Sequence, residues 1–266
     1  MSTEETTPAA DEPSPAFRRG EIFLHRRDLQ AARRCFGEAL VEARRSSDPR
    51  LLVPVLLSLG SVHAGLGDRE AARGCFREVL ALQREAPDSR AAGQALVNLG
   101  NLAREAGERE RARAYYLEAL DLLAPLDDAR SLGILHSNVG LLDLDAGHLD
   151  DAITALKTAI DCHKRSGFEE GLAGTWGQLG RAFLRAGNLA KAETCFNFSS
   201  SHFISLGDVA GEAGALRGLA AVYEARGDAE LVTRCRERIA EIASRYGLPL
   251  GERGTNADGG MPPVSS

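Results

Sequence analysis

Aromatic residues, cysteines and long apolar stretches are scarce in this sequence. Aromatics make up 5% of the 266 residues, and there are 5 cysteines, so a disulfide-dense scaffold is excluded. No stretch approaches the roughly 20 consecutive apolar residues that a membrane-spanning helix needs, and we expect no membrane partner. Hydrophobic residues still account for 44% and charged residues for 26%, which is typical of a soluble folded chain.

An excess of positive charge is also missing. The formal net charge is −6, and the segments 1–15 and 247–266 carry most of it, which leaves about −1 for residues 16–246. Without surplus cations to neutralise phosphates, the chain is not expected to bind nucleic acid. Lysine occurs only at positions 157, 164 and 191. The acidic N-terminus resembles neither a secretory signal nor a mitochondrial presequence, so we expect a cytoplasmic protein.

What the sequence does contain is an internal repeat with a period of forty residues. A Leu-Gly pair or its equivalent recurs without insertions, a second glycine follows seven positions later, and an alanine and a large apolar residue complete each unit. Such self-similarity indicates a stacked array of structural units, here six. The pairs are Leu59-Gly60, Leu99-Gly100, Val139-Gly140, Leu179-Gly180 and Leu219-Ala220, and the second glycines are Gly67, Gly107, Gly147, Gly187 and Gly227. Gly20 and Phe23 extend the register backwards to the first of the six units.

Each unit is predicted to form two antiparallel helices. In the third unit, apolar residues follow helical spacing over 91–103, and Gly107 is expected to end that helix in a left-handed conformation. The second helix would start at the polar residue after the glycine. Gly100 is expected to be small because the two helices approach closely, and Tyr116 to fill the remaining space. Acidic residues that suit helix N-termini open successive units, at Asp48, Asp88, Asp128 and Asp208.

The order of these residues resembles the tetratricopeptide repeat (TPR). Unit five matches best, with Trp176, Leu179, Gly180, Phe183, Ala192 and Phe196. The forty-residue length is similar to the long-repeat subclass of kinesin light chains, spindle-orientation adaptors and bacterial peptide-sensing regulators, in which the array binds peptides. The resemblance implies an all-α fold, a right-handed α-α superhelix (solenoid) of six TPR-like helix pairs over residues 16–246. Disordered tails are expected at 1–15 (acidic and Pro-rich) and 247–266 (Gly/Pro-rich).

Units one, five and six depart from the pattern. Unit one has Ala16 and Arg19 where unit five has Trp176 and Leu179. In the last unit, Val232 replaces the repeated alanine and Arg236 replaces the large apolar residue. Such changes are expected of a terminal unit, because its outer face meets water instead of a neighbouring unit. In unit five, a serine-rich segment between Phe198 and Phe203 replaces the usual Ala-Leu. Local repacking is the favoured interpretation, and an aromatic docking patch on the convex face is the alternative.

No set of residues for chemistry emerges from the sequence. Four cysteines occupy the same slot of the repeat and none forms a CxxC pair, so they are interpreted as structural. HExxH and phosphate-binding glycine motifs are missing. We therefore predict no catalytic residue, no cofactor, no metal site and no enzymatic activity. The four cysteines are Cys35, Cys75, Cys195 and Cys235.

Polar residues recur at forty-residue spacing on the first helices, which line the concave face in TPR arrays. Carboxamides suit peptide binding because each offers a donor and an acceptor to an extended backbone. The Asn-Leu-Gly-Asn run that starts at Asn98 also resembles the asparagine pair that holds the ligand backbone in long-repeat TPR adaptors. Cations toward the C-terminal half suggest an acidic stretch in the ligand. A solvated charged face is the alternative, because Glu105, Asp143, Asp145 and Glu224 occur among them. The predicted contacts are Asn98, Asn101, Ser137, Asn138, Gln178, Arg181, Arg185 and Arg217.

The predicted function is non-enzymatic binding of an extended peptide segment of a partner protein in the concave groove, as a scaffold or adaptor. An alternative stays open: a regulatory peptide sensor that changes its curvature on binding and acts through a separate output protein. The sequence leaves the partner and the oligomeric state undetermined.

Overall fold

The computed structural model describes residues 13–46, 48–82 and 88–247. These residues form twelve α-helices and one short 3-10 helix, and the chain divides into two compact units at Leu122 and Leu123. Each unit is described by itself. The expected tails lie largely in residues 1–12 and 248–266, which are outside the described residues.

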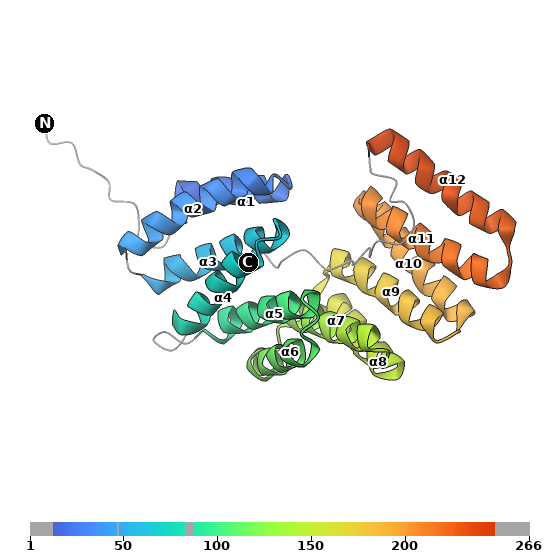
Figure 1. Cartoon of the computed structure of the whole chain (residues 1–266), viewed down its shortest axis with the longest axis horizontal. Coiled ribbons are helices and arrows are strands. Elements are labelled where there is room, and N and C mark those ends of the chain that lie inside the picture. Colours follow the sequence, from blue (N-terminus) through green and yellow to red (C-terminus); the bar gives the residue numbers. More distant parts are fainter. Residues whose placement is uncertain (1–12, 47, 83–87, 248–266) are drawn as a thin grey trace, which may run out of the picture. The chain divides into compact units, whose positions relative to one another are not determined.

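Unit 1 consists of three helix pairs (Figure 1). The helices α1 to α5 contact one another in sequence order, and the first helices α3 and α5 also touch. A hydrogen bond from Tyr116 to Asn101 joins α6 to α5. This layout follows from an apolar stripe on each helix that has to be buried against its neighbours. The helices are α1 (Pro15–His25), α2 (Leu29–Ser46), α3 (Pro49–Gly65), α4 (Arg69–Leu82), α5 (Ser89–Glu105) and α6 (Arg109–Leu123).

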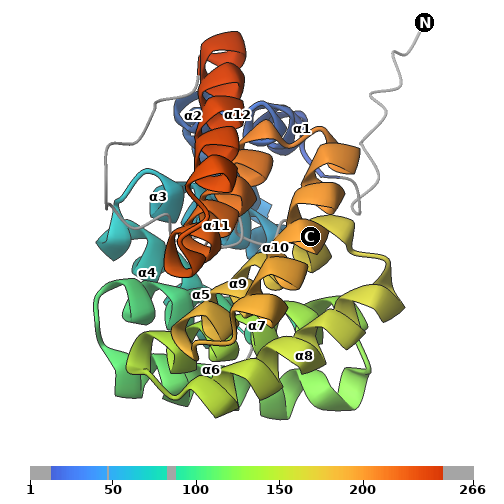
Figure 2. The same ribbon diagram turned by 90° about the vertical axis from the view of Figure 1, so that its right-hand side faces the viewer.

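Unit 2 repeats this arrangement after the 3-10 helix η1 (Ala124–Leu126). Figures 1 and 2 show α9 to α12 side by side, and each contacts the next. The first helices α7, α9 and α11 also contact one another in order and form one face of the unit. The helices are α7 (Ala129–Ala146), α8 (Leu149–Ser166), α9 (Glu169–Arg185), α10 (Leu189–Leu206), α11 (Val209–Arg226) and α12 (Ala229–Tyr246).

Aspartates start the first helices, as the sequence predicts. The side chain of Asp88 accepts hydrogen bonds from the backbone N–H groups of Arg90 and Ala91. This satisfies donors that have no partner inside the helix and places a negative charge at its positive end. Equivalent bonds are made by Asp48, Asp128 and Asp208.

Glycines end the helices in the left-handed conformation. Gly107, expected in this role, has φ of +77°, a backbone geometry that costs glycine little because it has no Cβ. Unit 2 goes further than the sequence prediction, because Gly167, Gly207 and Gly247 end the second helices in the same way. Glycines therefore close every helix of unit 2, at intervals of twenty residues.

The glycines of the Leu-Gly pairs receive a large side chain of the second helix, which is Leu156 at Gly140 and an aromatic ring at Gly60, Gly100 and Gly180. A Cβ built on Gly60 would lie 2.7 Å from the Phe76 ring, and Gly100 faces Tyr116 in the same way. Phe196 meets both Gly180 and Gly218. The expected close approach of the two helices is confirmed, and the fold is the predicted all-α array of six helix pairs. Within the described residues, no helix is long and apolar enough to cross a membrane.

Candidate functional site

Three carboxamide residues occupy one repeated position on successive first helices. Asn98 lies on α5 in unit 1, and Asn138 and Gln178 lie on α7 and α9 in unit 2. Their exposed fractions are 6%, 4% and 4%. Ser58, forty residues before Asn98, is buried as well. A ligand would therefore meet only the edges of these amides, between the side chains that surround them.

Asn138 stands out among them because its Nδ2 atom is buried and has no hydrogen-bond partner among the described residues. A buried donor without an acceptor costs about 1–3 kcal/mol, and such groups are rare in folded proteins. A peptide carbonyl placed against α7 would supply the missing acceptor. The position is thus chemically suited to backbone recognition.

Asn101 lies three residues after Asn98 on α5 and is half-buried. Its Oδ1 accepts a hydrogen bond of 2.6 Å from the Tyr116 hydroxyl on α6. This bond holds the side chain in one orientation and joins the two helices of the pair. The Nδ2 group is the part of Asn101 that can serve a ligand.

Ser137 is fully buried and belongs to a hydrogen-bonded chain inside unit 2. The Thr175 hydroxyl donates to the Gly171 carbonyl at 2.7 Å, so it accepts from Ser137 Oγ at 2.7 Å. Ser137 in turn accepts from His163 Nε2 at 3.4 Å. The predicted contact residue therefore connects α7, α8 and α9 and has no exposed surface of its own.

His163 is the titratable member of this chain, and its exposed fraction is 0%. With the proton on Nε2, its Nδ1 atom is an acceptor that has no partner among the described residues. Burial, with a smaller contribution from Arg130, lowers the pKa of His163 to about 4. The imidazole is therefore neutral near pH 7. Its ring packs edge-on against Phe168, with the centroids 5.4 Å apart.

The three predicted arginines have different surroundings. Arg185 donates to the backbone carbonyl of Leu144 near the end of α7, so it holds two first helices together. Arg181 on α9 is half-buried and Arg217 on α11 is exposed. Within the described part of the chain, neither of these two has an ion-pair partner. Arg181 and Arg217 are thus the cations of this face that an acidic ligand can reach.

The residues of this face form no constellation for catalysis. Ser137 and His163 are both fully buried, which leaves a substrate no route to the hydroxyl. Two cysteine thiols are poor nucleophiles: burial raises the pKa of Cys75 and of Cys195 to about 11, so their nucleophilic thiolate is scarce at neutral pH. Among the described residues, no group of three His, Cys, Asp or Glu is placed to hold a metal ion.

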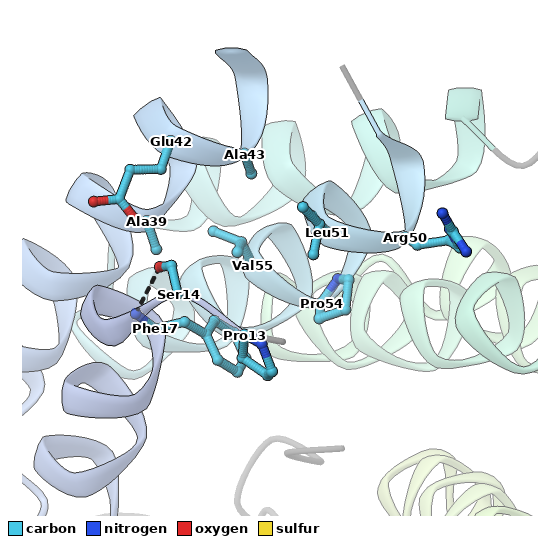
Figure 3. Close-up of a pocket in the computed structure, with 10 residues that line it drawn as sticks. All are labelled: Pro13, Ser14, Phe17, Ala39, Glu42, Ala43, Arg50, Leu51, Pro54 and Val55. Atoms are coloured by element: carbon cyan, nitrogen blue, oxygen red, sulfur yellow. Dashed lines mark hydrogen bonds between the residues drawn. The ribbon is translucent and has the colours of Figure 1, made fainter. Parts of the chain in front are cut away.

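Unit 1 contains an apolar cavity of about 320 Å³ between α1, α2 and α3 (Figure 3). Phe17 and Val55 face it from opposite sides, and Pro54 lies on its α3 wall. Arg50 at the rim is held by Asp48, with Nη2 and Oδ2 3.0 Å apart. This ion pair neutralises the cation at the mouth, and the cavity presents a mainly apolar surface.

Sequence reasoning missed the hydrogen bonds that link His163, Ser137 and Thr175. The available signal was polarity at apolar positions: the residues forty and eighty before Ser137 are Val97 and Leu57, and Ala95 and Leu135 precede Thr175 at the same spacing. A serine and a threonine at such positions need partners, because a buried hydroxyl without a hydrogen bond is unfavourable.

Comparison with known proteins agrees with this architecture. Residues 51–125 match the tetratricopeptide repeat family model. No curated protein matches the chain. Among solved structures, BtubC (BKLC) from P. vanneervenii is 21% identical, with a TM-score of 0.72 over 86% of this chain and 96% of that chain.

Two further structures share the fold at lower identity. A Rap protein complexed with Competence and Sporulation Factor is 15% identical, with a TM-score of 0.70 over 89% of this chain and 68% of that one. A putative kinesin light chain with nearly identical TPR-like repeats, from Podosopora anserina, is 14% identical, with a TM-score of 0.59 over 73% and 95%. Residues 51–125 thus match tetratricopeptide repeats, and the helix pairs of both units share the fold of these solved structures.

Proposed function

We propose that this chain is a non-catalytic protein-binding module that holds an extended peptide segment on its first helices. Proteins with this repeat generally mediate protein–protein interactions. The observation that carries the finer proposal is the buried Asn138 Nδ2 atom, which has no acceptor among the described residues. A peptide backbone offers a carbonyl at regular intervals, and a carboxamide can pair with it whatever the side chains are.

Each unit contributes contacts of its own. In unit 1 the proposed contacts are Asn98 and the Nδ2 group of Asn101. In unit 2 they are the amide edges of Asn138 and Gln178, and the cations Arg181 and Arg217 favour a ligand with carboxylates. Ser137 and Arg185 act indirectly, because their hydrogen bonds position the helices that carry the other residues.

The test uses a peptide selected from a random decapeptide display library on the full chain. We expect Asn138→Ala to weaken its binding about fivefold, which corresponds to the loss of one hydrogen bond of about 1 kcal/mol. Stability should not fall, because no intramolecular hydrogen bond of Nδ2 is lost and a buried donor without an acceptor is removed. Replacing single peptide bonds by esters, whose carbonyls are weaker acceptors, and altering the side chains in separate peptides identifies which part is recognised.

Asn197→Ala, at an exposed asparagine on α10, is the matched control and should bind like the parent chain. Calorimetry gives the affinities and thermal unfolding gives the stabilities. Equal affinity of the Asn138→Ala variant, or an equal loss in the control, would contradict the proposed site. A loss of stability without a loss of affinity would show that the amide serves packing.

A further inference from the structure

All three lysines of the chain line one groove in unit 2. The sequence contains lysine only at positions 157, 164 and 191. Lys157 and Lys164 lie seven residues apart on the same face of α8, and Lys191 faces them from α10. The groove between these helices has a volume of about 380 Å³, within the range of about 300–1,000 Å³ that is usual for ligand sites.

The floor of this lysine groove is apolar and rigid. Leu179 and Phe183 from α9, Ile160 from α8 and Cys195 from α10 line it, and all four are buried. Side chains packed in this way cannot move aside easily. The floor therefore offers a fixed apolar surface to a side chain that enters from outside.

An aromatic edge extends the floor outward. Trp176, the single tryptophan of the chain, lines the groove and stacks on Phe198 with the ring centroids 5.0 Å apart. Phe198 is 47% exposed. Phe203, the other aromatic of this helix noted in the sequence, packs against Gly211 instead. Of the two, Phe198 is the one placed to contact a partner.

The charges of the groove are unbalanced. Within the described residues, none of the three lysines forms an ion pair, and Asp161 is the one carboxylate among the residues that line the groove. Arginine on the same helix behaves differently, since Arg165 pairs with Asp127 at 2.7 Å. Two of the ammonium groups lie over aromatic rings, with Lys164 5.8 Å from the Trp176 centroid and Lys191 5.4 Å from that of Phe183.

The position of Lys191 adds to this positive potential. It is the third residue of α10, whose first turn carries the positive end of the helix dipole. A cation there is electrostatically unfavourable, and so are like charges gathered on facing helices. An anionic partner would relieve both.

We propose that the lysine groove docks an acidic segment of a partner protein, with one large apolar or aromatic side chain on the floor and flanking carboxylates at the lysines. The apolar floor selects a peptide over a simple anion, and the near-neutral charge of the folded part disfavours a nucleic acid. This surface lies on α8, α9 and α10 and is separate in its residues from the proposed contacts on the first helices.

Trp176 makes the proposal directly measurable, because its fluorescence originates in the groove itself. The probe is the capped pentapeptide Asp-Glu-Phe-Glu-Asp, titrated into the full chain. We expect a saturable change in fluorescence that weakens as salt is raised. Replacing all three lysines by glutamine should reduce affinity about tenfold, in line with three exposed ion pairs.

Two peptides and two variants are the controls. Asp-Glu-Ala-Glu-Asp lacks the apolar anchor and Ser-Ser-Phe-Ser-Ser lacks the charges, and both should bind more weakly. The matched variant R33Q/R34Q/R45Q removes three exposed cations of α2 and should leave affinity unchanged. The variant Asn138→Ala should also bind normally, so failure of the first-helix site and failure of this one are distinguishable.

Four results would overturn the proposal. They are no saturable signal up to millimolar peptide, unchanged affinity in the triple lysine variant, equal binding of the alanine peptide, and tighter binding of an oligothymidylate than of the acidic peptide. The last result would assign the groove to nucleic acid. Circular dichroism of each variant verifies that the helices are intact.

Discussion

Units 1 and 2 share one scaffold and differ in the polar groups that they bury. At the repeat position of Ser137, unit 1 has Leu57 and Val97, and both are buried. In unit 2 the serine joins a hydrogen-bonded chain with His163 and Thr175. The backbone path is the same in both cases. The comparison teaches that this repeat fixes where a side chain lies, while the residue type decides whether the interior is inert or titratable.

The cavity of unit 1 and the lysine groove of unit 2 also differ in their polar groups. The cavity of unit 1 is apolar, and its rim cation Arg50 is paired with Asp48. The lysine groove of unit 2 has an equally apolar floor, and its ammonium groups have no ion pairs within the described residues. Unit 2 therefore has the stronger electrostatic reason to bind a partner.

The largest effect should come from His163 and appear as a dependence on pH. Its pKa is about 4 in the folded state and about 6.5 when unfolded, so only the unfolded chain takes up the proton between these values. The contribution to stability is therefore complete above pH 6.5 and falls as the pH is lowered. The loss should reach about 2 kcal/mol at pH 5 and about 3 kcal/mol at pH 4.

Urea denaturation over this pH series measures the slope. His163→Leu copies the residue forty positions earlier, Leu123, and should flatten the slope of unit 2 toward the behaviour of an aliphatic interior. His25→Gln changes an exposed histidine of unit 1 and is the control. It should leave the slope of stability against pH unchanged. An unchanged slope in His163→Leu would contradict the buried, neutral state of the imidazole.

An intermediate effect on the free energy of unfolding is expected when glycines of the two units are replaced by alanine. It tests whether the helices of both units pack in the same way. Gly60 in unit 1 faces Phe76, and Gly218 in unit 2 faces Phe196. Alanine at either position should cost about 1–3 kcal/mol by overpacking. Gly74 and Gly214 have open space where a Cβ would be, so alanine there should stabilise by about 0.5–1 kcal/mol. Chemical denaturation of the four variants gives the signs, and opposite signs between units would break the comparison.

The smallest effect concerns helix starts. Asp88 in unit 1 accepts two backbone hydrogen bonds, whereas Asp228 in unit 2 makes no such capping bond. Asp88→Ala should therefore cost about 1 kcal/mol, and Asp228→Ala should cost clearly less. Both are read from denaturation midpoints. Equal losses would mean that charge near the helix end, rather than the hydrogen bond, accounts for the stabilisation.

Much of the fold could be predicted because the repeat encodes it locally. The glycine at 107 and the aspartate at 88 have conformations that follow from their own chemistry and neighbours. The pairing of Gly100 with Tyr116 could be predicted from the need for close helix contact. The glycines at 167, 207 and 247 lie outside the TPR signature, so the signature does not predict that they end the second helices of unit 2.

The candidate sites were harder to predict, because they depend on contacts between helices that are distant in sequence. Periodicity placed Asn138 and Ser137 on a first helix, and it could not show that one has an unpaired amide and the other a hydroxyl bonded to Thr175. The composition alone shows that lysine is rare in this chain. That the three lysines surround one groove depends on α8 and α10 lying on either side of α9, which is a property of the fold.

The glycines that close the helices of unit 2 also bear on how such a chain can change length during evolution. With φ between +64° and +84° at every joint, each helix pair enters and leaves with the same backbone geometry. A duplication or deletion of forty residues by unequal recombination would join two such ends without a new connection having to arise. The number of pairs can therefore change in whole steps, while each inserted pair carries its own terminator.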